Sequence, residues 1–146
     1  MVQTGHNAYK QNVGNTVISK EQLLLKLYSG ALKFLAIAKR GMEENNPRVK
    51  GENITKVLNI ITELDCALDM ETGGEMAENL SSLYRHILFS LVNANLKNDM
   101  TVILDVEDII QEIKEGFEEV LKQTTAPVSA PMENKAETKG GMQIAI

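Results

Sequence analysis

Residues 73–95 contain apolar side chains that recur at steps of three or four residues. This spacing forms one face of an α-helix, and its members are Met76, Leu80, Leu83, Ile87, Leu91 and Ala94. At about 100° per residue, a second stripe falls on roughly the opposite side of the same helix. That stripe consists of Phe89, Val92 and Leu96, together with Arg85. A helix that is apolar on two faces is either buried all round or covers its second face with something else. Because the chain has only 146 residues, the second possibility must be considered.

Three other segments show helical periodicity, and polar or breaking residues separate them. Ser19 and Gln22 form a capping box, which predicts where the first helix begins. Pro47 ends that helix, because the residue before a proline is pushed out of the α region. Thr72-Gly73-Gly74-Glu75 is the next predicted break. The predicted helices cover, in chain order, about Lys20–Glu44, Arg48 or Gly51 to Met70, a third helix that ends near Lys97, and about 101–122.

Because the breaks between the helices are short, consecutive helices should lie antiparallel. The sequence therefore predicts an all-α fold, an antiparallel up-down four-helix bundle over residues 19–123. Residues 1–18 are mostly polar with a few apolar side chains, and we interpret them as an N-terminal arm that can dock on the bundle. Residues 124–146 show no periodicity and are rich in small and polar residues, which is typical of a disordered C-terminal tail.

Composition narrows the classes of function. The single cysteine, Cys66, rules out an internal disulfide framework and fits a reducing cytoplasm. No signal peptide and no apolar run long enough to cross a membrane are evident, so we expect a cytoplasmic protein without membrane insertion. Residues 10–50 carry a balance of +5 and residues 101–123 a balance of −5, and these segments can attract each other. No basic face is interleaved with aromatic residues, so nucleic acid is not an expected partner.

We find no pattern typical of an enzyme, a metal site or a cofactor site. A di-metal bundle needs Glu-x-x-His pairs, but Gln3 and Leu83 precede His6 and His86 at that spacing. No EF-hand loop and no glycine-rich phosphate loop are present either. One alternative stays open, because helical bundles also serve as histidine phosphotransfer modules in signalling. His86 shares a polar face with Asn79, Ser82 and Asn93, so it is expected to be exposed as that role requires.

The feature that remains is surplus apolar surface on the helices. A wide core stripe or a homodimer interface would explain it without a further partner. The functional interpretation is a groove that receives amphipathic segments of a partner chain.

Short stretches in a fixed order connect the chain to a known family. They run through Ala8-Tyr9, Leu27-Tyr28-Ser29-Gly30-Ala31-Leu32, Phe34-Leu35, Ala38, Glu63-Leu64, Leu68-Asp69, Gly73-Gly74-Glu75-Met76-Ala77-Glu78-Asn79-Leu80, Leu83-Tyr84, Leu91, Ala94-Asn95 and Asp99. In order and spacing these stretches resemble the flagellar secretion chaperone family, FliS. The resemblance covers most of residues 8–122.

The resemblance implies an antiparallel bundle whose outer grooves bind the disordered C-terminal segment of flagellin. Such binding would prevent polymerisation in the cytoplasm, and the complex would then be delivered to a component of the flagellar export gate. The free protein is expected to be a monomer or a weak homodimer. In this family the arm can cover the binding surface, which would make Tyr9 and Val13 a displaceable cover. The helical wheel and this mode of binding together suggest a set of contact residues, namely Ile60, Leu64, Phe89, Val92 and Leu96.

Overall fold

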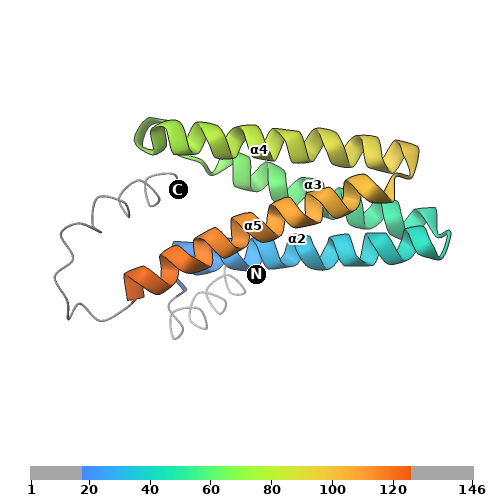
Figure 1. Ribbon diagram of the computed structural model, residues 1–146, viewed down its shortest axis with the longest axis horizontal. Helices are drawn as coiled ribbons and strands as arrows, with labels where there is room; N and C mark the ends of the chain where they lie inside the picture. The colour runs from blue at the N-terminus through green and yellow to red at the C-terminus, as the bar shows by residue number, and fades with distance from the viewer. Residues whose placement is uncertain (1–17, 126–146) are drawn as a thin grey trace, which may run out of the picture.

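The computed structural model describes residues 18–125, and all regular structure within that range is α-helical. The helices are α2 (Lys20–Glu43), α3 (Pro47–Cys66), α4 (Met70–Lys97) and α5 (Met100–Thr125). Each packs on the next, and α5 packs back on α2, so that α2 and α4 stand diagonally opposite (Figure 1). The predicted all-α, up-down four-helix bundle is therefore confirmed. Residues 1–17 of the predicted arm and residues 126–146 of the predicted tail lie outside the described residues, while residues 124 and 125 belong to α5.

Local hydrogen bonds set the residues at which α2 and α3 begin. The Ser19 side chain accepts a hydrogen bond from the Gln22 backbone N–H, and the Gln22 side chain accepts one from the Ser19 backbone N–H, both at 3.1 Å. The predicted capping box is thus present, and α2 begins at Lys20. After the C-terminal end of α2, Asn46 caps α3, because its side chain accepts a hydrogen bond from the Val49 N–H at 3.2 Å. Pro47 is the first helical residue, where its missing N–H is not needed.

The junction between α3 and α4 differs from the prediction. We expected the second helix to reach Met70, but α3 ends at Cys66 and α4 already begins at Met70. The reason is Asp69, whose carboxylate accepts from the N–H groups of Glu71 and Thr72, both at 3.1 Å. Hydrogen bonds from the Thr72 side chain and backbone also hold the pKa of this carboxyl below its ordinary value. The glycine break survives only as a kink inside α4, where Gly74 has φ 53°.

The face of α4 that packs into the core also differs from the predicted face. Tyr84 is buried, whereas Leu83, which we placed in the seam, is 37% exposed. The Tyr28 and Tyr84 hydroxyls hydrogen-bond to each other across the bundle, and the Tyr28 ring stacks on Phe117 with centroids 5.6 Å apart. Burial raises the pKa of Tyr84 to about 12, and it also raises the pKa of the Tyr28 phenol. Both phenols therefore stay neutral at physiological pH and tie α2 to α4.

Replacing one member of this tyrosine pair should destabilise the bundle. In Tyr84→Phe the buried Tyr28 hydroxyl loses its partner, which we expect to lower the free energy of unfolding by about 1–3 kcal/mol. Urea denaturation followed by circular dichroism measures this change. The double variant Tyr28→Phe/Tyr84→Phe leaves no orphaned hydroxyl, so its loss should be smaller than the sum of the two single losses. Strictly additive losses would show that the two hydroxyls do not depend on each other.

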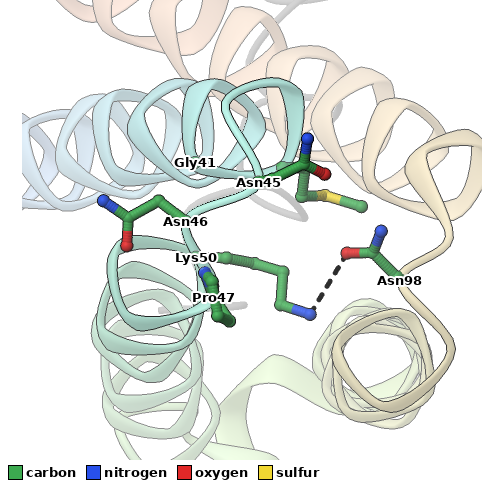
Figure 2. Close-up of a pocket in the computed structure, with 7 residues that line it drawn as sticks. Gly41, Asn45, Asn46, Pro47, Lys50 and Asn98 are labelled. Carbon is green, nitrogen blue, oxygen red and sulfur yellow. Dashed lines mark hydrogen bonds between the residues drawn. The ribbon is translucent and has the colours of Figure 1, made fainter.

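Lys50 joins the two turns at one end of the bundle. Its Nζ donates to the Asn95 carbonyl at 3.0 Å. It also donates to the Asn98 side-chain oxygen at 3.2 Å (Figure 2). A cavity of about 220 Å³ surrounds it, lined by Gly41, Met42, Asn45, Asn46, Pro47, Lys50 and Asn98. A cation at the C-terminal end of α4 also interacts favourably with the helix dipole. Lys50 therefore holds the last turns of α4, including Leu96, at a fixed position relative to α3.

A second polar contact connects α2 with α5. Lys39 Nζ lies 2.8 Å from Glu107 Oε1, and both side chains are partly buried. This ion pair joins the basic and acidic segments noted in the sequence.

Candidate partner-binding surface

The outer face of α4 carries large apolar side chains that no other described helix covers. Phe89 is 72% exposed, Val92 47% and Leu96 79%. These residues follow one another at steps of three and four, so they form a single row along the helix. Arg85, one turn before Phe89, continues the row. We call these four residues the α4 stripe: Arg85, Phe89, Val92 and Leu96.

The stripe faces outward because the other side of α4 is committed to the core. Ile87, Leu91 and Ala94 are each 0% exposed and point into the bundle. Phe89 follows Ile87 by two residues, which turns its side chain by about 200° around the helix. The same packing that buries the inner row therefore directs Phe89 away from the core. The sequence-based expectation of two apolar faces on this helix agrees with the structure.

Two contacts set the register of α3 beside the stripe. Ser81 Oγ donates to Asp65 Oδ1 at 2.7 Å, and Lys50 reaches the Asn95 carbonyl near the other end of α4. Between these contacts the two antiparallel helices place Leu58 level with residues 87 and 88. The side of α3 that carries Asp65 also carries Thr62, Leu58 and Gly51, which precede it at successive steps of three, four and seven residues. An uncharged edge of α3 thus flanks the apolar part of the stripe.

The residues of this α3 edge project little from the helix surface at two positions, Gly51 and Leu58. A Cβ added at Gly51 would meet no atom within 4 Å, so the space beside this part of α3 is open. Leu58 is only partly buried against the core. The α4 stripe therefore lies beside an uncharged part of α3 that has open space at Gly51.

One charged pair stands at the N-terminal end of the stripe. The nearest approach of Arg85 to Asp65 is 4.0 Å, between Nε and Oδ2. The Arg85 side chain is 76% exposed, whereas that of Asp65 is 23% exposed. The stripe is therefore positive at one end and apolar over the rest of its length.

The candidate contact residues do not all lie on this surface. Phe89, Val92 and Leu96 do. Ile60 is half-buried on another side of α3, where its Cδ1 would lie 3.7 Å from a Cβ placed on Gly30 of α2. Leu64 is only 2% exposed, so the expectation that it is accessible to a partner is wrong. It continues the inner row of α3 formed by Ile54, Val57 and Ile61. Tyr9 and Val13 fall outside the described residues.

Sequence reasoning missed the core position of Tyr84. The signal that could have found it is heptad spacing, since Tyr84 lies seven residues after Ala77 and seven before Leu91. All three residues are buried.

Comparison with known proteins decides the family. A family model described as "Flagellar protein FliS" matches residues 2–124. The chain belongs to the FliS family. The predicted resemblance is thereby confirmed, and membership supports a role as a flagellar export chaperone, which is not an enzymatic role. It also favours this role over the phosphotransfer alternative, although His86 is exposed as that alternative required.

Three relatives named "Flagellar secretion chaperone FliS" illustrate the similarity. The Vibrio cholerae protein is 38% identical over 102 residues, which cover 70% of this chain and 75% of that protein. The Bacillus subtilis protein is 32% identical over 121 residues, covering 83% and 89%. The Salmonella typhimurium protein is 38% identical over 121 residues, covering 80% and 90%. The FliS match thus spans the whole bundle, α4 stripe included.

Two further findings concern residues 18–125 of this FliS chain. Those residues contain no group of three or more His, Cys, Asp or Glu side chains placed to hold a metal ion. Each helix in that range is too short or too polar to span a bilayer.

Proposed function

We propose that this protein is a cytoplasmic export chaperone that binds the C-terminal segment of flagellin along the α4 stripe. Covering that segment keeps flagellin from polymerising before export, and the complex is then delivered to the flagellar export gate. The observation that carries the proposal is the row of Phe89, Val92 and Leu96, exposed on a helix whose inner face is already buried. Membership of the FliS family supports flagellin as the occupant.

The chemistry of the surface suits such a client. A segment that is disordered when free loses chain entropy on binding, so it needs a long apolar contact to bind well. From Phe89 to Leu96 the stripe extends about 10 Å along the helix axis, which matches two turns of an amphipathic guest. Ile60 offers a second, smaller contact nearer α2. Tyr9 and Val13 are proposed as a displaceable cover on the strength of the family resemblance alone.

A pair of binding measurements tests the proposal. Full-length flagellin from the same organism should form a 1:1 complex with this protein, detected by size-exclusion chromatography with light scattering. Flagellin that lacks its last ~40 residues, a length that spans about 60 Å as helix, should not. Equal binding of both forms would contradict the proposal.

A second copy of the chain is the competing occupant of the stripe. Analytical ultracentrifugation of the free protein separates the two possibilities. A monomer, or a weak dimer that dissociates when flagellin is added, supports the proposed function. A tight dimer that flagellin does not dissociate would instead assign the stripe to self-association.

A further inference from the structure

The α4 stripe begins with one charged residue, Arg85, and its other members are apolar. Arg85 lies one turn, about 6 Å, before Phe89, and Leu96 lies about 16 Å from Arg85. At the other end Leu96 is 79% exposed, Lys50 Nζ holds the neighbouring Asn95 carbonyl, and the exposed Lys97 follows Leu96. Positive charges thus lie near both ends of the stripe, and Arg85 is the one that stands within the row itself.

Arg85 has donors to spare at this position. The carboxylate nearest to it, Asp65, already accepts a hydrogen bond from Ser81 at 2.7 Å through Oδ1. Its other oxygen, Oδ2, comes no closer than 4.0 Å to Arg85, beyond hydrogen-bond distance. With 76% of its side chain exposed, the guanidinium offers its planar fork of N–H groups to solvent.

The surroundings leave room for a carboxylate from a partner. The α3 edge beside the stripe is uncharged until Asp65, and Glu78, the next acidic residue on the same face of α4, lies two turns before Arg85. Once a guest covers Phe89, water is displaced around Arg85, and the local interaction between opposite charges becomes stronger.

We propose that Arg85 determines which segment the stripe accepts. The guest is an amphipathic helix that carries an Asp or Glu three or four residues from the first of its apolar anchors. That carboxylate pairs with Arg85, and the apolar anchors cover Phe89, Val92 and Leu96. The inference rests on the proposed function, because it takes the flagellin C-terminal segment as the guest.

Charge reversal tests this pairing. Arg85→Glu in the full chain should weaken binding of a synthetic flagellin C-terminal peptide about 10-fold by isothermal titration calorimetry, and added salt should narrow the gap from the unaltered protein. Arg85→Gln should give a smaller loss. Arg40→Glu, an exposed arginine on α2, is the matched control and should bind like the unaltered protein.

Compensating changes in the peptide identify the partner residue. Each Asp or Glu of the peptide is replaced by Lys in turn. One such peptide should bind the unaltered protein more weakly yet regain affinity for Arg85→Glu, and its apolar residues should begin three or four positions away. If no Lys peptide shows this reciprocal effect, the inference about Arg85 is wrong.

The outcomes separate this inference from the proposed function. Unchanged binding by Arg85→Glu, together with lost binding by Phe89→Asp, would overturn the role of Arg85 and leave the stripe as the binding surface. A peptide that fails to bind even the unaltered protein would overturn both. Circular dichroism confirms that each variant is folded before its affinity is compared.

Discussion

Phe89→Asp is expected to weaken binding of the flagellin C-terminal segment by about 30-fold or more, equivalent to about 2 kcal/mol. Phe89 is the aromatic residue of the α4 stripe and is 72% exposed in the free protein. In the complex an aspartate at this position would be covered by the guest's apolar side chains and would lack a hydrogen-bonding partner. In the free protein the same aspartate stays in water, so the bundle should remain folded.

Calorimetric titration of the peptide measures the loss, and urea denaturation checks that stability is retained. Leu104→Asp is the matched control. Leu104 is 44% exposed on α5, outside the stripe, and the same change of chemistry there should leave the affinity near that of the unaltered protein. Binding by Phe89→Asp within twofold of the unaltered protein would show that the stripe is not the binding surface.

Gly41→Ala should lower the free energy of unfolding by about 2 kcal/mol, although alanine is the better helix former. A Cβ at Gly41 would lie 2.8 Å from the Lys50 backbone nitrogen and 3.1 Å from the Asn46 carbonyl oxygen. Backbone atoms cannot move aside as a flexible side chain does, so α2 and the start of α3 must separate. Because Lys50 also holds the end of α4, the strain should reach the position of Leu96.

Chemical denaturation compares this variant with Gly116→Ala in α5. A Cβ at Gly116 would meet no atom within 4 Å, so that variant keeps only the gain in helix propensity. We expect it to be more stable than the unaltered protein by about 0.5–1 kcal/mol. If Gly41→Ala were equally stabilising, the close approach of α2 to the α3 N-terminus would not be a constraint on the fold.

Sequence reasoning predicted helix ends well where a side chain caps a neighbouring backbone group. Ser19 with Gln22 caps the start of α2 as predicted, and α3 begins at Pro47, one residue before the earlier of its two predicted starts, Arg48 and Gly51. It failed at the start of α4, where the break was predicted over residues 72–75 but the helix is capped earlier, by Asp69. Hydrogen bonding to Asp69 prevails in the structure, and Gly74 absorbs the resulting kink.

The candidate site was predicted in part. Phe89, Val92 and Leu96 lie opposite the inner row of α4, and that relation depends only on helical periodicity. The assignments on α3 were weaker because its apolar arc is wide, and periodicity does not show which part of a wide arc faces the core. Leu64 proved to be buried and Ile60 half-buried beside α2.

The amino-acid sequence by itself determined the four helices, most of their ends and the two-faced character of α4, because caps, breaks and periodicity act within a few residues along the chain. Only the tertiary structure decided how far each helix is rotated about its own axis. A step of one residue turns a helix face by about 100°. Packing of α4 against α3 and α5, with the Tyr28 contact across the bundle, therefore selected Tyr84 over Leu83 for the core and left the α4 stripe outside.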